Sequence, residues 1–337
     1  MSAGPLFSVL TPTWQRASYL PDVWNSLKAQ SFRSFEWIVG NDGSSDDTRE
    51  VVERLAAQSD FKVVLVDADS HVGKSRIDNE MVRVASGELC LWCDSDDMLL
   101  HDALGVLARA WNDPSLPERD GVIGVGALCE ADGGVLGAVK PSEGTFVRTL
   151  YEVNASIAAD SLLSVRTEVL RRNPFPEVDL HIPESSIWER IGRDRILFVP
   201  HVLKHVRYRS DHAISFSGRL KFCRGRAHDL AAGQRISHIR RTTFAQAMRT
   251  ANFVRYCIHG DIGPREAWAM WPDTPGRRIG LLACGLPGGM LALRDIIRGV
   301  VDKTHVEFER TRMSATIEAR VLSDLNDSAD TKHMSLQ

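Results

Sequence analysis

The stretch ELCLWCDSDDML, residues 88–99, joins a short apolar run to a dense group of acids. The run Leu89–Cys93 has the length and composition of a buried β-strand, and Asp94, Asp96 and Asp97 follow at its carboxyl end. Carboxylates this close repel one another and destabilise a fold unless a cation lies among them. Ligands of open α/β sheets bind just beyond the carboxyl ends of strands. The stretch therefore predicts a divalent-metal site at a strand end that handles an anionic substrate.

Strands and helices are expected to alternate before this stretch. Strands are predicted over residues 6–10, 35–39 and 63–66, and amphipathic helices over residues 19–30, 48–58 and 73–86. This alternation predicts a mostly parallel sheet with helices on both faces. Neither G-x-G-x-x-G after the first strand nor G-x-x-x-x-G-K-[ST] occurs, which argues against ordinary dinucleotide-binding and P-loop enzymes.

The pattern after the acids is less regular. We predict helices over residues 101–111, 161–171 and 185–191, and strands over residues 122–128, 134–139, 196–199 and 204–208. Beyond residue 217 the chain becomes helical and basic. We therefore expect an α/β domain over residues 1–216, a mainly helical C-terminal region over 217–323 and a flexible tail over 324–337.

The composition is that of a soluble globular protein, with 43% hydrophobic and 25% charged residues. Its six cysteines show no disulfide or zinc spacing, which favours free thiols in a reducing compartment. The amino terminus lacks the charged segment of a signal peptide. The apolar run Ile279–Leu293 contains Pro287 and two adjacent glycines, so we expect it to be too short and too broken to span a bilayer. These features predict a cytoplasmic protein.

Four motifs occur in a characteristic order. T-P-T-x-x-R begins at Thr11, N-D-G-S-S-D-D-T at Asn41, G-K-S-R-x-x-N at Gly73 and D-S-D-D at Asp94. Together they resemble the family 2 glycosyltransferases, inverting enzymes that use nucleotide-sugar donors. The resemblance covers about residues 7–215, and its combination and order are specific. It implies the GT-A fold of nucleotide-diphospho-sugar transferases, a Rossmann-like sheet flanked by helices, here with a helical C-terminal extension.

The resemblance assigns the acid cluster to a D-x-D motif that binds Mn²⁺ or Mg²⁺. Asp96 is the implied direct ligand, while Asp94 reaches the ribose or a metal-bound water, and Asp97 supports them or caps a helix. Hard divalent cations prefer such oxygen ligands and bridge to phosphate oxygens. In the segment Tyr208–Ser215, the resemblance implies that His212 completes the metal shell or touches the diphosphate. A structural histidine in a surface turn is an equal alternative.

The implied donor site draws on several loops. The resemblance assigns to it Thr11, Pro12, Thr13, Arg16, Asp42, Lys74, Asp94, Ser95 and Arg209. Asp42 is the implied hydrogen-bond acceptor for the nucleotide base, and Lys74 begins a helix whose N-terminus favours anions. For Arg16, contact with a phosphate and a solvated position in the loop are equally open.

Inverting transfer also needs a general base that takes the proton of the acceptor hydroxyl, a contribution of about 10²–10⁴ in rate. In similar enzymes the base lies before a helix, roughly a hundred residues past D-x-D, often as Glu-Asp. Glu184 fits this position, although Ser185 replaces the commoner aspartate. Glu177, Asp179 and Asp160 are alternatives, and a structural role for Glu184 in the first turn of a helix is another.

Charge is distributed unevenly along the chain. Residues 1–100 hold 9 Lys/Arg against 16 Asp/Glu, a net of −7, whereas residues 201–260 hold 12 against 2, a net of +10. A positive flank of the diphosphate site, contact with an acidic membrane and a solvated helical face would each explain the basic stretch. With the apolar run Ile279–Leu293 nearby, we favour peripheral attachment to the inner membrane face. No motif that reads nucleic acid accompanies the charge, so we expect no nucleic-acid partner.

The sequence thus predicts a metal-dependent inverting glycosyltransferase. It would move a sugar, with a UDP-sugar as the expected donor, to a saccharide or lipid-linked acceptor in polysaccharide, lipopolysaccharide or glycoconjugate synthesis. Two alternatives remain open. One is a non-catalytic nucleotide-sugar binding protein. The other is a nucleotidyltransferase of similar fold, although the glycine-rich opening of that class is absent after the first strand.

Overall fold

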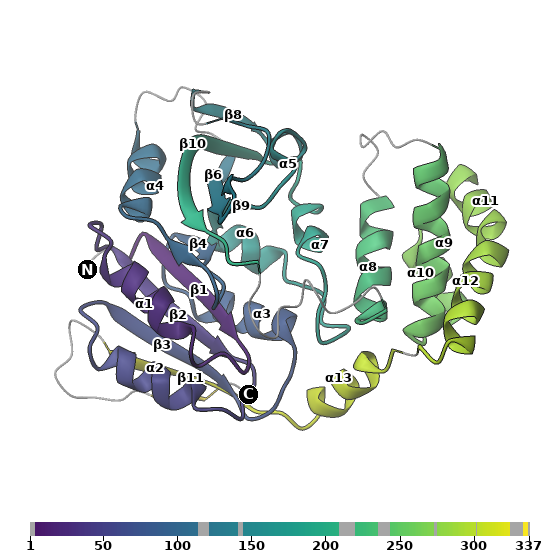
Figure 1. The fold of residues 1–337 in the computed structure, drawn as a ribbon, viewed down its shortest axis with the longest axis horizontal. Coiled ribbons are helices and arrows are strands. Elements are labelled where there is room, and N and C mark those ends of the chain that lie inside the picture. The colour runs from purple at the N-terminus through teal and green to yellow at the C-terminus, as the bar shows by residue number, and fades with distance from the viewer. Residues whose placement is uncertain are drawn as a thin grey trace.

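The computed structural model describes most of the chain (Figure 1). The described residues are 4–113, 121–140, 144–208, 220–234, 243–272, 275–300, 302–323 and 333–335. One twisted sheet with helices on both faces forms the larger part, and a layer of helices lies beside it. This arrangement confirms the predicted α/β class with a helical C-terminal extension.

Four parallel strands form the half of the sheet that carries the motifs. They are β1 (Phe7–Thr13), β2 (Phe35–Asn41), β3 (Lys62–Ala68) and β4 (Leu89–Trp92), in the order β3-β2-β1-β4. The connecting helices are α1 (Leu20–Lys28), α2 (Thr48–Ala56) and α3 (Lys74–Val84). Apolar side chains of α1 and α2 pack on one face of these strands and those of α3 on the other. Because the strands are parallel, their carboxyl ends lie at one edge, where the motif loops meet.

The other half of the sheet is mixed, so the expectation of a mostly parallel sheet is wrong beyond β4. Its strands are β5 (Met98–Leu99), β6 (Val122–Ala131), β7 (Gly134–Val135), β8 (Phe146–Thr149), β9 (Ser161–Arg166) and β10 (Arg195–His205). Strand β9 runs antiparallel between β4 and β6, and β10 is parallel to β6. The two short strands predicted after residue 195 are the single strand β10. Helices α4 (Ala103–Asn112), α5 (Leu150–Ile157), α6 (Thr167–Arg172) and α7 (Ser185–Trp188) lie between these strands in sequence.

The predicted helix over residues 161–171 is wrong in its first half, which is strand β9. Leu162 packs into one core layer, whereas Leu163 and Val165 pack into the other. That alternation is the two-residue period of a strand. Two neighbouring strands supply the backbone hydrogen bonds that a helix would have made internally. Tertiary pairing therefore overrides the local helical pattern, and a helix follows only at α6.

A separate small core holds the helical region together. Its helices are α8 (Cys223–Gln234), α9 (Thr243–His259), α10 (Pro264–Met270), α11 (Pro275–Ala283), α12 (Gly285–Ile297) and α13 (Thr304–Arg312). Phe253 and Trp271 lie at its centre, with ring centroids 4.4 Å apart. The chain then returns to the sheet, where β11 (Ile317–Ser323) pairs antiparallel with β3, and β12 (His333–Ser335) pairs with β11. The expected helical region therefore ends before residue 317. The predicted boundary near residue 217 lies outside the described residues.

The apolar run near the C-terminus is not broken as predicted. Within the described residues, one helical stretch, Gly276–Ile297, is long and apolar enough to cross a membrane by length and composition alone. The Cys284 amide donates to Gly280 and the Gly288 amide donates to Cys284, which carries the helical path across the junction of α11 and α12. Pro287 is the third residue of α12, where a backbone N–H has no partner within the helix.

A buried carboxylate joins the sheet to the helical region. Asp179 is fully buried and accepts hydrogen bonds from the backbone amides of Leu180 and Gly225, the latter in α8. Burial raises the pKa of Asp179 to about 6, although these donors work in the opposite direction. The protonated form is therefore the one that the fold favours.

We predict that Asp179→Asn changes how stability depends on pH. The contribution of Asp179 to the free energy of unfolding is fully present below its ordinary pKa of 3.8. It is lost as pH rises through about 6. Between about pH 4 and pH 7, wild type should therefore lose on the order of 3 kcal/mol relative to the variant. Urea unfolding at several pH values measures this, with Asp261→Asn as an exposed control. A constant difference between wild type and Asp179→Asn would contradict the prediction.

Candidate active site

The acid cluster lies at the carboxyl edge of the sheet, in the turn after β4. The Asp97 amide donates to the Asp94 carbonyl at 2.9 Å and closes this turn. Thr11 anchors it to β1, because its hydroxyl donates to the Cys93 carbonyl at 2.8 Å and accepts from the Trp37 indole at 2.9 Å. Thr11, assigned from the sequence to the nucleotide site, thus uses its hydroxyl inside the protein.

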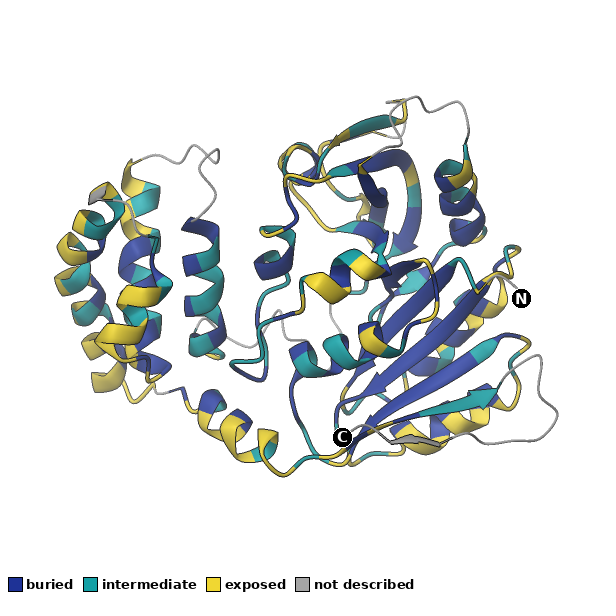
Figure 2. Ribbon diagram, turned by 180° about the vertical axis from the view of Figure 1, so that it is seen from behind, coloured by how far each residue is buried: buried dark blue, intermediate teal, exposed yellow. Residues whose placement is uncertain are grey.

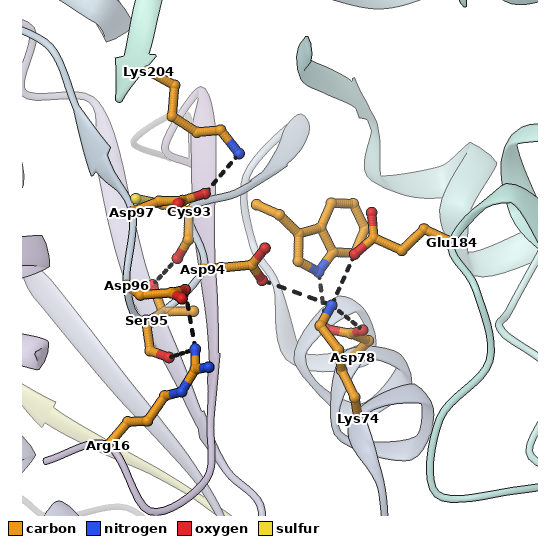
Figure 3. Close-up of polar contacts among 12 residues, drawn as sticks. Arg16, Lys74, Asp78, Cys93, Asp94, Ser95, Asp96, Asp97, Glu184 and Lys204 are labelled. Atoms are coloured by element: carbon orange, nitrogen blue, oxygen red, sulfur yellow. Dashed lines mark hydrogen bonds and ion pairs between the residues drawn. The ribbon is translucent and has the colours of Figure 1, made fainter. Parts of the chain in front are cut away.

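Each acid of the cluster meets a different cation (Figure 3). Arg16 Nη1 lies 3.0 Å from Asp96 Oδ1, Lys74 Nζ 3.7 Å from Asp94 Oδ1, and Lys204 Nζ 2.9 Å from Asp97 Oδ2. The three cations come from the loop after β1, the start of α3, and β10. The repulsion anticipated from the sequence is therefore offset by the protein itself. Of the two roles left open for Arg16, the solvated one does not fit, since its side chain also donates to Ser95 Oγ at 3.3 Å.

Lys74 lies where three carboxylates converge (Figure 3). Its ammonium is 3.0 Å from Glu184 Oε1 and 3.1 Å from Asp78 Oδ2, in addition to its contact with Asp94. Burial opposes the charge, but the three carboxylates outweigh burial and raise the pKa of Lys74 well above its ordinary value. Lys74 therefore remains protonated and links the acid cluster to the predicted general base.

Asp78 fixes the position of Lys74 and was not singled out from the sequence. It is buried, and its second oxygen accepts a hydrogen bond from the Trp92 indole at 2.9 Å. Burial raises the pKa of Asp78 to about 6, while Lys74 acts to lower it. The signal in the sequence is its spacing, because an acid four residues after Lys74 lies on the same side of a helix.

Glu184 reaches Lys74 because the loop before α7 closes onto the start of α3. The Lys74 amide donates to the Leu180 carbonyl at 2.9 Å. Gly73 has φ +95°, and a Cβ there would lie 2.5 Å from the Leu180 oxygen, so the approach requires glycine. The Lys74 charge is the main influence on Glu184 and lowers its pKa below the ordinary value of 4.5, which keeps it ionised.

Asp94 and Glu184 line the same cavity, which has a volume of about 210 Å³. Trp92 and Trp188 meet edge to face in its wall, with centroids 6.1 Å apart. The remaining lining residues are Asn154, Ala159, Asp160, Ser161, Leu163 and Lys204. A larger cavity of about 500 Å³ between α7 and α8 contains neither Asp94 nor Glu184. We place the chemistry at the smaller cavity because it joins the cluster to the predicted base.

The alternative bases differ in where they lie. Glu177 accepts a hydrogen bond from Asn79 at 2.8 Å and lies outside this cavity. Asp179 is fully buried at the joint with α8. Asp160 does line the cavity, where it accepts a hydrogen bond from the Tyr208 hydroxyl at 2.7 Å. Glu184 and Asp160 therefore remain as carboxylates that could meet an acceptor.

Asp42 organises a second part of the site, at the end of β2. It accepts hydrogen bonds from the amides of Val72 and Gly73 at 2.7 and 3.0 Å, and His71 Nδ1 lies 3.0 Å from its other oxygen. Burial acts against protonation of His71, but the Asp42 carboxylate outweighs it and raises the pKa of His71. The His71 ring stacks on Trp14 at 4.4 Å, and this indole is 37% exposed. This aromatic pair was missed from the sequence because its members are 57 positions apart.

The remaining assigned residues are placed as follows. Pro12 and Thr13 belong to β1, which runs three residues beyond the predicted end. Thr13 Oγ1 is buried and makes no hydrogen bond with the described residues. Arg209 and His212 lie outside the described residues.

The described residues offer a partial set of ligands for a divalent cation. They contain no group of three His, Cys, Asp or Glu side chains arranged for a metal ion. Asp94 Oδ1 is nevertheless buried, and no described residue donates a hydrogen bond to it. Magnesium-like ions commonly take only one or two protein carboxylates together with phosphate oxygens and water. Asp94 and Asp96 fit that kind of site, in which the substrate completes the coordination.

Comparison with known proteins agrees with this geometry. Residues 8–149 match the family model "Glycosyl transferase family 2". This stretch, 142 of the 337 residues, is similar to the family 2 glycosyltransferases. The chain is 35% identical over 109 residues to a Campylobacter jejuni GalNAc(5)-diNAcBac-PP-undecaprenol beta-1,3-glucosyltransferase, covering 32% of this chain and 35% of the relative. It is 33% identical over 185 residues to the Staphylococcus aureus poly(ribitol-phosphate) beta-N-acetylglucosaminyltransferase TarS, covering 53% of this chain and 30% of TarS. The matches thus span about a third of these relatives.

Solved structures show the same fold. S. aureus TarS 1–349 in complex with UDP-GlcNAc superposes with a TM-score of 0.55 at 18% identity, covering 82% of this chain and 79% of that structure. The mannosyltransferase PcManGT from Pyrobaculum calidifontis, in complex with GDP-Man and Mn²⁺, superposes with a TM-score of 0.51 at 18% identity. The match covers 87% of this chain and 88% of that structure. The chain therefore has the predicted GT-A fold.

Lys204 is a part of the site that the sequence analysis missed, and we predict that Lys204→Met is strongly destabilising. The variant leaves Asp97 buried without its cation, which should lower the free energy of unfolding by about 3–5 kcal/mol. Adding Asp97→Asn should restore much of the loss, because the buried charge is removed. Urea unfolding of the single and double variants measures this.

The matched control is Arg172→Met, which breaks an exposed ion pair with Glu168 on α6. It should cost no more than about 1 kcal/mol. Equal effects of Lys204→Met and Arg172→Met would show that Lys204 does not neutralise a buried acid.

Proposed function

We propose that the protein transfers a sugar from a nucleotide-diphosphate-sugar donor to an acceptor hydroxyl, with inversion at the anomeric carbon. The observation that carries this proposal is that Asp94 and Glu184 line one cavity, with the Lys74 ammonium within 3.7 Å of both carboxylates. The family 2 domain supplies the precedent for the reaction class.

Glu184 acts as the general base. Its carboxylate takes the proton of the acceptor hydroxyl while the oxygen attacks the anomeric carbon on the face opposite the leaving diphosphate. Lys74 keeps Glu184 ionised before the acceptor arrives. Proton removal of this kind contributes about 10²–10⁴ in rate. Trp188 in the cavity wall offers an apolar face to a sugar ring.

The donor lies along the carboxyl edge of β1, β2 and β4. The base binds near Asp42 and the exposed face of Trp14, framed by Pro12 and Thr13. The diphosphate meets Lys74 at the N-terminus of α3, where the helix end favours anions, with Arg16 and Ser95 on the other side. The family resemblance also assigns Arg209 to the donor and His212 to the metal shell or the diphosphate.

Asp96 and Asp94 would hold a divalent cation, Mn²⁺ or Mg²⁺. When bound, such an ion neutralises charge on the leaving diphosphate. The Mn²⁺ in the mannosyltransferase complex supports this assignment, as does the buried Asp94 Oδ1, which accepts no hydrogen bond from the described residues. Arg16, already 3.0 Å from Asp96, holds that carboxylate toward the diphosphate end of the site.

The names of the relatives support a role in building cell-surface polysaccharide or a related glycoconjugate. One is named for a reaction on an undecaprenol-linked saccharide and another for a reaction on poly(ribitol-phosphate). A UDP-sugar donor follows the TarS complex with UDP-GlcNAc. We accordingly propose a saccharide or lipid-linked acceptor.

The decisive test is Glu184→Gln. Sugar transfer should fall by about 10²–10⁴, because glutamine cannot take the proton. Donor binding should survive, so a UDP-sugar with Mn²⁺ should raise the melting temperature of the variant as it does for wild type. At about a hundred times its Kd, a ligand adds about 2.7 kcal/mol of stability. Product formation and thermal shift are measured on the same samples.

Glu177→Gln, outside the cavity, is the matched control and should keep its activity. Wild-type turnover in Glu184→Gln would move the base to Asp160. Donor binding by wild type without transfer or donor hydrolysis would support a binding protein instead, and release of pyrophosphate would support a nucleotidyltransferase.

The contact between Lys74 and Glu184 predicts a shift in pH dependence. Glu184 must be ionised to act, so kcat/KM falls as pH drops through its pKa, which Lys74 holds below 4.5. In Lys74→Gln that pKa rises, and the acidic limb of the profile should move to higher pH. Arg76→Gln, two residues further along α3, should leave the limb in place. If the acidic limb of the profile does not move in Lys74→Gln, then Lys74 does not set the pKa of the base.

A further inference from the structure

Helices α11 and α12 carry an exposed row of large apolar side chains, here named the apolar stripe. Its members are between 58% and 82% exposed and recur every three or four positions: Ile279, Leu282, Leu286, Met290, Leu293 and Ile297. That spacing places them along one face of a helical path. Figure 2 shows exposed residues along these outermost helices. A monomeric soluble protein rarely leaves so continuous an apolar surface uncovered.

The stripe cannot turn inward, because the opposite face of the same helices is packed on α9. Leu281 and Ala292 are buried on that inner face. Gly288 meets α9 so closely that a Cβ there would lie 2.6 Å from the Ala251 oxygen. The two helices are therefore fixed to the helical region with their apolar side outward.

Arginines bracket the stripe, and exposed acids are absent from it. Arg277 and Arg278 precede the uncharged run Ile279–Leu293, and Arg294 and Arg298 follow it. The sole acid between residues 275 and 300 is Asp295, which is buried and lies 2.5 Å from Arg255 and 3.2 Å from Arg294, whose side chain stays 47% exposed. The surface is thus apolar along its length and positive at its ends.

We propose that α11 and α12 lie flat on an anionic lipid bilayer. The apolar stripe would enter the boundary between headgroups and acyl chains, and the arginines would meet lipid phosphates. The distribution of charge favours this occupant. In a two-fold contact between copies of the chain, antiparallel helices would bring one pair of arginines against the other, with no exposed acid on these helices to neutralise them.

Because α11 and α12 pack on α9, we expect them to lie on the membrane surface and not to cross the bilayer. The 22 residues Gly276–Ile297 extend for about 33 Å, enough to cross a bilayer. A helix that crossed the bilayer would have to separate from α9 or carry the rest of that core into lipid.

The proposed membrane contact is therefore on α11 and α12, and not on the basic stretch 201–260 as expected from the sequence. Within the described part of that stretch, Arg224 pairs with Glu266 and Arg255 with Asp295, so these charges are used internally.

The test is vesicle binding by the full chain. We use phosphatidylcholine vesicles with and without an equal amount of phosphatidylglycerol, and measure the bound fraction by sedimentation at low salt. Wild type should bind the anionic vesicles at least about tenfold more tightly. Leu286→Glu with Met290→Glu should lose about tenfold or more on both kinds of vesicle. Arg294→Gln with Arg298→Gln should lose mainly the preference for anionic lipid.

Met313→Glu is the matched control, since Met313 is 90% exposed but follows α13, away from the stripe. It should bind as wild type does. Thermal unfolding with UDP-sugar checks that each variant retains its fold, and the arginine pair tests the proposal without altering the apolar side chains.

Several outcomes would overturn the proposal. They are an absence of binding by wild type, equal losses in Met313→Glu, and unchanged binding in both double variants. Light scattering adds another: a wild-type dimer that the Leu286→Glu, Met290→Glu pair dissociates, with no vesicle binding in either, would make the stripe a contact between copies. Vesicle binding does not depend on sugar transfer, so failure of the proposed function would leave this result standing.

Discussion

The contact of Lys74 with three carboxylates is the interaction on which the arrangement of the site depends. Three elements of the chain meet there: the first two turns of α3, the turn after β4 and the loop before α7. Without a shared cation, Asp94 and Glu184 would repel across a small cavity. With it, two acids ninety positions apart in sequence are held together. In the proposed reaction, the same contact links the diphosphate end of the site to the base.

The fold around this contact buries charged groups, which is unfavourable in free energy. A buried aspartate beneath Lys74 and a buried ion pair between Lys204 and Asp97 are each unfavourable in isolation. Hydrogen bonds from the Trp92 indole and the Arg207 amide support these two aspartates. Buried acids with such partners are usual where a protein positions charged groups for a ligand.

The helical region relates to the sheet through a few specific contacts. Asp179 accepts a hydrogen bond from the Gly225 amide near the start of α8. After the helices end, β11 extends the sheet beyond β3. The helices therefore form an insertion between parts of one sheet instead of an independent tail. A membrane-facing α11–α12 pair would consequently hold the catalytic cavity at a defined distance from lipid, which suits an acceptor carried on a lipid.

The alternation of strands and helices up to β4, the acid cluster, Asp42, Lys74 and Glu184 could all be predicted from the sequence, because local periodicity and short motifs encode them. Strand β9 could not, since its neighbours in the sheet, and not its own pattern, supply its hydrogen bonds. Nor could the pairing of each acid with its cation, because Arg16, Lys74 and Lys204 come from distant elements. The sequence by itself determined which chemical groups the site would contain. Only the tertiary structure decided which of them meet, because Coulomb and hydrogen-bond interactions act through distances in space and not along the chain.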